Sequence, residues 1–359
     1  VTLNSAADAV PAGPAIDIDG MRTLTIDLNA MTYTLSRIAI ANCMPDDAAA
    51  ACPSKAFRTK DGGVKIWMTR NLNWNGGPEI GAMKLGSRLV PAYSGSATSG
   101  GYDPQDPYIE RNPAYDEEES GGSVKGDQAV TDRHGRLYTL DEILLGTPAG
   151  GLGRGITSIE WPSAYNVGST FVDAVGTQIT ARVFKSAEMK AVTDDERFFA
   201  ENPALSAQIQ GICPYGWHIA NFRDWYDLAY AALEASRGDG TYPVREEMLT
   251  IAKLVATNAN NVAPWLRTQE GWTSTPARAA GADAFDFNLY PTGWRLNKNG
   301  YGQYGDTAHS WVPLIGSSAK KTWRLNNVKA TSNYWFNDNL DAGNPAVGIR
   351  CVKNYKVKK

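Results

Sequence analysis

Histidine and cysteine, the side chains that most often perform chemistry, are scarce in this sequence of 359 residues. Three histidines occur, at positions 134, 218 and 309, and no two stand at the i,i+4 spacing that aligns ligands on one helix face. His218 follows the turn at residues 214–217 and precedes a predicted helix. We therefore expect His218 to make a structural hydrogen bond rather than to catalyse a reaction or bind a metal.

Residues 300–305 formally match the G-x-G-x-x-G motif of dinucleotide-binding folds. That motif functions between a strand and a helix, whereas asparagine-rich and aromatic, strand-like sequence flanks it here. No G-x-S-x-G, H-E-x-x-H or Walker motif occurs, and the sequence fixes no two carboxylates into the pair that a glycosidase needs. We therefore predict no catalytic residue, no metal site and no nucleotide cofactor.

The four cysteines, at positions 43, 52, 213 and 351, are even in number. Cys43 and Cys52 flank a small loop in polar, turn-forming sequence, which favours a disulfide between them and oxidising surroundings. No C-x-x-C spacing or histidine partner indicates zinc. We expect an exported protein, and four buried thiols in a cytosolic protein are the alternative.

The chain is also rich in aromatic residues, with 11 Trp and 16 Tyr. Several stand near turns in the C-terminal half, where an exposed ring can stack on a sugar. Tryptophan more often fills a core, so that alternative stays open. The candidate ligand-binding aromatic residues are Trp294, Trp311, Trp323 and Trp335, with Tyr301 and Tyr304 near them.

Residues 335–341 add polar groups to this set, and Asn337 and Asp338 complete the predicted ligand-binding residues. The stretch is similar to the Trp-Asn-Asp triplet that helps to bind calcium in sugar-binding C-type lectins, with Phe336 inserted. Oxygen ligands crowded into one turn can hold calcium, but Asn and Asp also form ordinary turns. We expect no cofactor, and calcium is the alternative.

Composition bounds the class of protein. The length suffices for one large or two ordinary domains. A net charge of −3 with 20% charged residues excludes a basic footprint for nucleic acid or a polybasic membrane patch. The 35 glycines and the many aromatic residues are typical of loop-rich β or α+β proteins. No run of about 18 apolar residues predicts a membrane span.

Amphipathic helices are expected to position the candidate residues. The principal helix spans residues 222–236, with Asn221 as its N-cap and Asp224 favoured near the positive end of the helix dipole. A second helix is predicted over residues 194–209, interrupted by a proline, and a third over residues 245–257.

Segments that alternate apolar and polar residues predict strands. Two lie at residues 24–29 and 31–35, and we expect the segment 24–35 to pair with the following chain or with another subunit. The pattern Trp-Arg-Leu-Asn occurs at residues 294–297 and 323–326, which predicts two strands of one sheet. Further strands are predicted at residues 64–68 and 347–352, and a strand end passing into a short helix at residues 135–145.

These landmarks predict two parts of unequal size. We expect residues 1–36 to be an N-terminal tail with a β-strand segment and residues 37–359 to form the principal domain. Within that domain, residues 76–132 are a long polar insertion with an acidic run at residues 116–119. A loop of this length is either functional or without fixed structure.

The landmarks, in this order, resemble the Fibrobacter succinogenes major paralogous domain of surface and secreted proteins of Bacteroidetes. The most specific pieces are Cys-Pro-x-Gly-Trp-His at residues 213–218 and Arg-Cys-Val-Lys at residues 350–353. Further matching pieces lie at residues 66–73, 135–139 and 291–295, so the resemblance covers most of the chain from about residue 60 to residue 353.

This resemblance implies an α+β, C-type-lectin-like fold, in which two helices pack on a small twisted antiparallel sheet with long irregular loops. It also implies a disulfide between Cys213 and Cys351 that ties the helix to the last strand. The insertion at residues 76–132 and the pair Cys43 and Cys52 depart from the usual pattern. The family has no agreed catalytic role.

We therefore expect a non-catalytic, adhesin-like protein at the cell surface or secreted, which binds a glycan or a host or neighbouring protein and no nucleic acid. One alternative is a structural or assembly module of a surface fibre or lipoprotein complex. A carbohydrate-active enzyme is the third interpretation.

Overall fold

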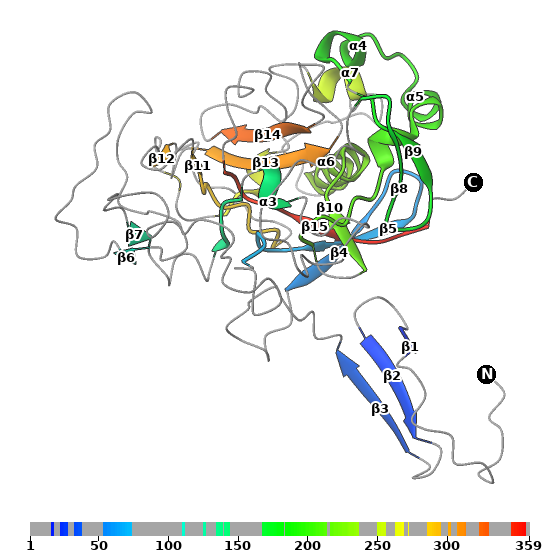
Figure 1. Cartoon of the computed structure of the whole chain (residues 1–359), viewed down its shortest axis with the longest axis vertical. Helices are drawn as coiled ribbons and strands as arrows, with labels where there is room; N and C mark the ends of the chain where they lie inside the picture. Colours follow the sequence, from blue (N-terminus) through cyan, green and yellow to red (C-terminus); the bar gives the residue numbers. More distant parts are fainter. Residues whose placement is uncertain are drawn as a thin grey trace.

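The structure is a computed structural model of the whole chain (Figure 1). It describes residues 53–73, 134–138, 140–143, 167–182, 184–213, 216–236, 250–255, 263–268, 272, 286–295, 307–313 and 346–356, and the other short strands named below. Within these residues the architecture is mixed α+β, as predicted, with few helices and several small antiparallel sheets. No helix within them is long and apolar enough to cross a membrane.

A four-stranded antiparallel sheet forms the centre of the described chain. Its strands, in spatial order, are β10 (Trp217–Ile219), β15 (Cys351–Lys353), β5 (Val64–Met68) and β4 (Ser54–Arg58). Val352 lies opposite His218 on one side and opposite Trp67 on the other, so the last strand is central. The strand predicted at residues 64–68 is confirmed, and the one predicted at 347–352 is confirmed in part.

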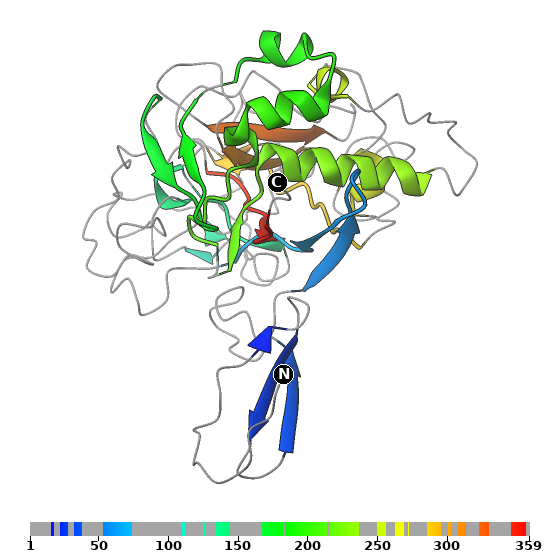
Figure 2. The same cartoon turned by 90° about the vertical axis from the view of Figure 1, so that its right-hand side faces the viewer.

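One long helix, α6 (Phe222–Ser236), packs across this sheet (Figure 2). On its sheet side, Trp225 meets Trp67 edge to face with ring centroids 4.9 Å apart, and Phe287 lies 5.5 Å from Trp67. All three side chains are fully buried. Burial of a large apolar side chain contributes about 1.5–3 kcal/mol, so this aromatic contact is a major part of the core.

The start of α6 is fixed by Asn221 and Asp224, as the sequence predicts. The side-chain Oδ1 of Asn221 accepts a hydrogen bond from the Asp224 N–H at 2.9 Å, and the Asn221 N–H donates to Asp224 Oδ2, also at 2.9 Å. These reciprocal bonds satisfy two backbone donors. Both residues are fully buried, so water cannot replace either bond.

Short helices cover the side of α6 that faces away from the sheet (Figures 1 and 2). They are α4 (Ser186–Lys190), α5 (Asp195–Glu201) and the 3-10 helix η3 (Pro203–Ser206). The predicted interruption of the helix at residues 194–209 is confirmed, because α5 ends before Pro203, which lacks the N–H that would continue it, and only the end differs, since η3 stops at Ser206. Of the helix predicted at residues 245–257, the structure describes α7 (Ile251–Leu254). Two more single-turn helices are α3 (Leu140–Ile143) and α8 (Ala263–Leu266).

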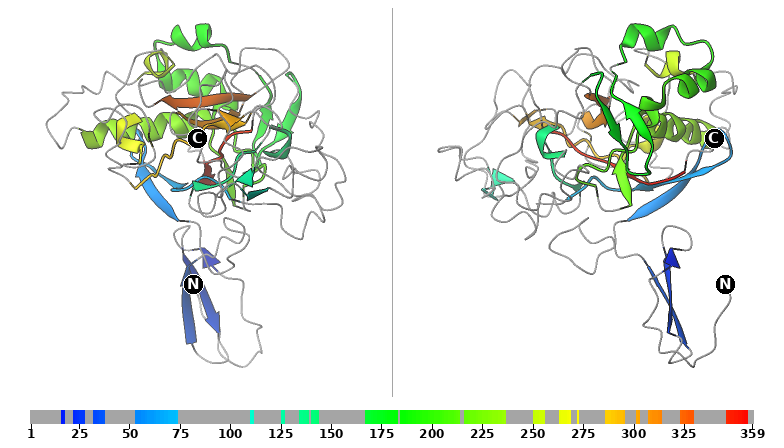
Figure 3. Two further views of the ribbon diagram at one scale, coloured as in Figure 1. Left: turned by 90° about the vertical axis from the view of Figure 1, so that its left-hand side faces the viewer. Right: turned by 45° about the vertical axis from the view of Figure 1, so that its right-hand side comes forward.

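Three strand pairs lie beside the central sheet, and Figure 3 shows the longest of them, β13 with β14. The pairs are β8 (Thr170–Val172) with β9 (Gln178–Thr180), β11 (Trp294–Arg295) with β12 (Tyr301–Gly302), and β13 (Thr307–Pro313) with β14 (Trp323–Lys329). The prediction that residues 294–297 and 323–326 share a sheet is wrong. Each copy pairs with its neighbour in the chain, because closing a short loop costs less entropy than closing a long one.

The strands predicted near the N-terminus form a separate three-stranded sheet, which Figures 1 and 2 show apart from the central sheet. Its strands are β1 (Ile16–Asp17), β2 (Arg22–Asp27) and β3 (Thr32–Arg37). Of the insertion at residues 76–132, the structure describes only β6 (Glu110–Arg111) paired with β7 (Lys125–Gly126). Cys43 and Cys52 lie outside the described residues.

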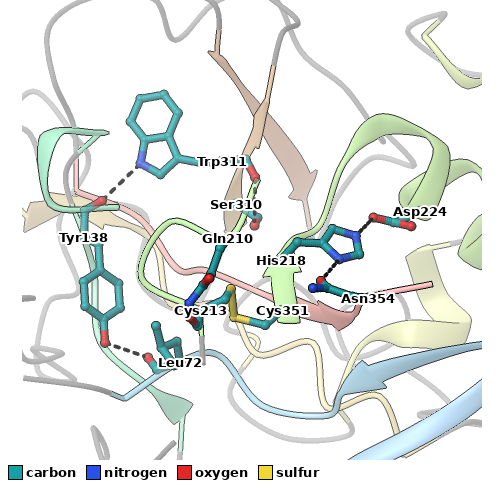
Figure 4. Close-up of a disulfide and its surroundings, with 10 residues drawn as sticks. All are labelled: Leu72, Tyr138, Gln210, Cys213, His218, Asp224, Ser310, Trp311, Cys351 and Asn354. Carbon is teal, nitrogen blue, oxygen red and sulfur yellow. Dashed lines mark hydrogen bonds and ion pairs between the residues drawn. A yellow bond between two sulfur atoms is a disulfide. The ribbon is translucent and has the colours of Figure 1, made fainter. Parts of the chain in front are cut away.

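Cys213 and Cys351 form a disulfide, as the family resemblance implies (Figure 4). The bond joins the turn before β10 to the first residue of β15 and spans 138 residues of sequence. Both cysteines are fully buried. The bond therefore ties together, inside the core, the two ends of a segment of 138 residues.

Replacing both cysteines by alanine, Cys213→Ala with Cys351→Ala, should lower the free energy of unfolding by about 4–5 kcal/mol, because so long a closed loop restricts the unfolded chain. Urea denaturation followed by tryptophan fluorescence measures this loss. Wild-type protein under reducing conditions is the control, since there the bond is broken while both sulfur atoms remain. A loss below about 1 kcal/mol in both samples would contradict the expected role of the bond.

Candidate functional site

Two of the four predicted ligand-binding tryptophans lie in the core. Trp294 is 5% exposed and Trp311 is 4% exposed. Trp311 stands on β13, whose residues are all buried, and its Nε1 donates to the Tyr138 carbonyl at 3.1 Å (Figure 4). A buried ring offers no face to a sugar. For these two residues the expectation of ligand stacking is therefore corrected to core packing.

The other predicted ligand-binding residues are not tested by the described part of the chain. Trp323 is the first residue of β14 and lies opposite Pro313 in the register of the pair. The structure does not describe the side chain of Trp323. Trp335, Asn337 and Asp338 lie wholly outside the described residues. Ligand binding at these positions stays a prediction.

His218 makes the structural hydrogen bonds that the sequence predicts. It is fully buried on β10, with Nε2 2.9 Å from Asp224 Oδ2 and Nδ1 3.0 Å from Asn354 Oδ1 (Figure 4). The ring therefore links the start of α6 to the chain just after β15. The other two histidines, His134 and His309, are half-buried and buried.

Asp224 is the centre of a buried polar cluster that joins helix to sheet. Its Oδ1 accepts hydrogen bonds from Lys65 Nζ at 2.7 Å and from the Tyr355 hydroxyl at 2.9 Å. Its Oδ2 accepts bonds from His218 and from the Asn221 N–H, each at 2.9 Å. Four partners thus occupy both oxygens of a carboxylate that is fully buried.

Lys65, on β5, is the cation around which this cluster forms. Its Nζ lies 2.7 Å from Asp224 Oδ1 and 2.8 Å from Asp227 Oδ2, and 4.4 Å from the centre of the Tyr355 ring. Only 6% of the Lys65 side chain is exposed. Two carboxylates and an aromatic face therefore replace the water that a buried ammonium loses.

The electrostatics of the cluster favour its charged form. Burial by itself raises the pKa of the Asp224 carboxyl, but attraction to Lys65 and His218 outweighs burial and holds that pKa well below its usual range. Burial lowers the pKa of Lys65, but Asp224, Tyr355 and Asp227 together raise it well above its usual range. Burial and the charge of Asp224 raise the pKa of the Tyr355 hydroxyl, which stays protonated.

Arg223 extends the cluster toward the surface. Its guanidinium bonds to Asp227 Oδ2 at 3.3 Å and to Glu196 Oε2 at 3.0 Å, and it lies 4.4 Å from the centre of the Phe199 ring. Burial alone lowers the pKa of Arg223, but the two carboxylates raise it. Asp227 thus bridges the inner cation, Lys65, and the outer one.

The cluster contains residue types found in active sites, but its geometry suits a structural role. Lys65, Asp224 and His218 are at most 6% exposed, and their polar atoms bond to other members of the cluster. General acid–base catalysis requires a group within reach of a substrate proton. Within the described residues, no group of three or more His, Cys, Asp or Glu side chains could hold a metal ion.

Sequence reasoning missed Lys65, Asp227 and Tyr355. One signal was present, since Lys65 is the one charged residue in the otherwise apolar stretch 64–68, and a buried lysine must meet a carboxylate. Asp224 and Asp227 stand three residues apart on one helix, a spacing that places them on the same face. Only the fold could show which lysine this face meets.

A second buried cation, Arg350, holds main-chain carbonyl groups. Its guanidinium donates to the carbonyls of Met68 at 3.1 Å, Phe287 at 2.9 Å and Asn288 at 2.6 Å, and its Nε donates to Asn71 Oδ1 at 2.7 Å. Arg350 is 1% exposed. Asn288 has a φ of 55°, a left-handed conformation that is uncommon outside glycine. Arg350 therefore stabilises a strained turn against the central sheet.

Asp224→Asn should lower the free energy of unfolding by about 3–5 kcal/mol, because it leaves Asp227 as the one carboxylate that balances the buried positive charge of Lys65.

The dependence of the free energy of unfolding on pH should change as well. Because folding lowers the pKa of Asp224, its contribution is complete above pH ~4 and is lost as the pH falls further. Because folding raises the pKa values of Lys65 and Tyr355, their contributions are complete below pH ~10 and are lost as the pH rises. Denaturant unfolding at acid, neutral and alkaline pH measures both the loss of stability at low pH and the loss at high pH.

Glu201→Gln is the matched control for this variant. Glu201 pairs with Arg197 four residues earlier, and their side chains are 57% and 74% exposed. Loss of so exposed a pair should cost less than about 0.5 kcal/mol. The structural role of Asp224 is contradicted if the two variants lose equal stability. It is also contradicted if the stability of Asp224→Asn falls at low pH as steeply as that of the wild type.

Arg350→Lys should destabilise the protein by about 2–3 kcal/mol, because an ammonium group cannot reach all the acceptors that the planar guanidinium bonds. Arg197→Lys, at an exposed position, is the control and should change little. Thermal unfolding compares the two variants. The amide hydrogens of residues 286–290 should also exchange faster in Arg350→Lys. Unchanged exchange there would contradict the role of Arg350 as a clamp, that is, as the side chain that holds the carbonyls of Phe287 and Asn288 against the central sheet.

Comparison with known proteins gives one match. The family model described as the Fibrobacter succinogenes major domain matches residues 62–353, most of the chain. No curated protein and no solved structure matches at the significance required. The match begins two residues before β5 and ends at the last residue of β15, so it includes α6, the disulfide and three of the four strands of the central sheet, β5, β10 and β15.

Proposed function

The chain belongs to the Fibrobacter succinogenes major domain family, and we propose that it is an exported, non-catalytic binding protein. In this proposal the principal domain has a C-type-lectin-like fold and acts at the cell surface or in secreted form. Its recognition surface is formed by the segment of residues 258–346. The ligand is a glycan or a host or neighbouring protein.

The observation that carries this proposal is the way the described parts of this segment are anchored. Ser310 forms a parallel bridge with Gly348, and Trp311 Nε1 donates to the Tyr138 carbonyl at 3.1 Å. These attachments come in addition to the clamp of Arg350 on Phe287 and Asn288. Loops held at their bases by a rigid frame are the usual carriers of binding residues.

The composition of the segment supports a polar ligand. Trp323, Trp335, Asn337 and Asp338 lie between the anchored strand β13 and the anchored residues 346–350. Amide and carboxylate groups can bond sugar hydroxyls while an aromatic ring covers the apolar face of the sugar. Calcium held by the oxygen atoms of Asn337 and Asp338 is a variant of this proposal.

Two properties of the core support a non-catalytic, exported protein. The described groups most suited to acid–base chemistry, Lys65, Asp224 and His218, bond to one another inside the core. The disulfide between Cys213 and Cys351 is of the kind that persists in oxidising compartments. An assembly module is the second candidate function, favoured by the separate N-terminal sheet. A carbohydrate-active enzyme is the third, and the sequence fixes no two carboxylates into the pair that glycoside hydrolysis needs.

Trp323→Ala and Trp335→Ala test the binding surface. A glycan array first identifies ligands of the wild-type chain, and titration then measures the affinity of each variant. If the rings stack on sugar, at least one variant should lose binding with the melting temperature nearly unchanged. Trp311→Ala is the matched control, because removal of this buried ring should cost about 3–5 kcal/mol of stability.

The outcomes separate the parts of the proposal. If both variants unfold the protein, or if both keep wild-type affinity, the binding surface does not include these tryptophans. If the wild-type chain binds no glycan on the array, recognition of a glycan is contradicted. If chelation of calcium abolishes binding of the ligand, the version of the proposal with bound calcium is favoured. If chelation leaves binding unchanged, that version is excluded.

A further inference from the structure

The N-terminal sheet has an edge strand of regular pattern. In its order β1-β2-β3, β3 (Thr32–Arg37) has β2 as its one hydrogen-bonded neighbour among the described strands. Figures 1, 2 and 3 show this sheet apart from the four-stranded sheet. An edge of this kind presents a row of backbone N–H and C=O groups to which another strand can pair.

The size of the sheet argues that it needs such a partner. β1 contributes two residues, so the sheet consists mainly of the hairpin of β2 and β3, with six residues in each strand. An isolated two-stranded hairpin is at best marginally stable in water. Additional strands would supply the hydrogen bonds and apolar area that the hairpin lacks.

The register sorts the residue types of the hairpin onto two faces. Leu24 stands opposite Leu35, and Ile26 stands opposite Tyr33, so the apolar positions share one face. The other face carries mainly threonine and serine positions. Any strand added at the edge must continue this division, because a shift of one residue exchanges the two faces.

The sequence of β3 is nearly symmetric about Thr34. The next residues on either side, Tyr33 and Leu35, are both apolar, and the residues after them, Thr32 and Ser36, both carry a small hydroxyl. A second, antiparallel β3 centred on Thr34 therefore sets hydroxyl residues opposite hydroxyl residues and apolar opposite apolar. Both faces continue across the contact, which makes this strand complementary to itself.

Charge favours the antiparallel direction. Arg22 and Arg37 stand opposite each other at the open end of the hairpin, and Asp27 stands at the turn end. A parallel copy would place the two basic ends side by side, and like charges in that position repel. An antiparallel copy sets each basic end level with the turn end of the other copy, so the two pairs of arginines lie at opposite ends of the contact.

We propose that two copies of this chain associate through β3, paired antiparallel with Thr34 on the two-fold axis. The two N-terminal sheets then form one continuous sheet. Because the same strand is used by both copies, the contact closes on itself and yields a dimer rather than a fibre. This association is independent of ligand binding by residues 258–346, so each can fail without the other.

The variant T34C in the full chain tests the pairing. The two copies of this position meet at the axis, so mild oxidation should link two chains and double the mass from 38.9 kDa on a non-reducing gel. T25C is the matched control, since Thr25 is the partner of Thr34 on the central strand β2. Its two copies would be three strand spacings apart, ~14 Å, beyond the reach of a disulfide.

A second pair of variants tests the contact without cross-linking. T34K brings two like charges together at the axis and should halve the mass measured by light scattering, whereas T25K should leave it unchanged. The melting temperature shows that each variant keeps the principal domain folded. Equal cross-linking of T34C and T25C, or a wild-type chain that has the mass of one copy at every concentration, overturns the proposal.

Discussion

A buried ammonium group must be surrounded by anions, and much of this core is arranged to meet that requirement at Lys65. The lysine comes from a strand of the central sheet, Asp224 and Asp227 come from the long helix, and Tyr355 comes from the chain after the last strand. Removal of the strand or of the helix would leave a charge unpaired in the interior, and removal of the C-terminal segment would remove the Tyr355 hydroxyl that bonds Asp224. The cluster therefore makes the positions of sheet, helix and C-terminal segment depend on one another.

The end of the chain is where these dependences meet. Residues 350–355 contribute the guanidinium clamp of Arg350, the disulfide of Cys351, and the side chains of Asn354 and Tyr355 that bond the polar cluster. Their partners stand more than 100 residues earlier in the chain in most cases, and 282 residues earlier for the bond to Met68. Contacts of such separation make loop closure expensive, so we expect the principal domain to fold slowly and cooperatively.

This arrangement separates stability from recognition. Asp224 and Lys65, two groups whose pKa values are strongly shifted, hold the frame together and are closed to solvent. In many proteins such groups mark an active site, but here their mutual bonds explain their state without a substrate. The segment proposed for recognition is instead attached to the frame through Arg350 and β13, so its loops can vary without loss of the core.

The sequence by itself determined the features that depend on local pattern or on ordered motifs. The cap of the long helix at Asn221 and Asp224, the strand at residues 64–68, the N-terminal strands and the bond of Cys213 with Cys351 could all be predicted from it, because each has a short-range pattern or a family signature. The tertiary structure alone decided the rest. It showed that Trp294 and Trp311 are core residues, that the two Trp-Arg-Leu-Asn segments pair with separate neighbours, and that Lys65 faces the two aspartates of the helix. The physical reason is that burial and charge pairing depend on residues far apart in the chain, and alternation along a strand or helix shows only that a face is buried, not what lies against it.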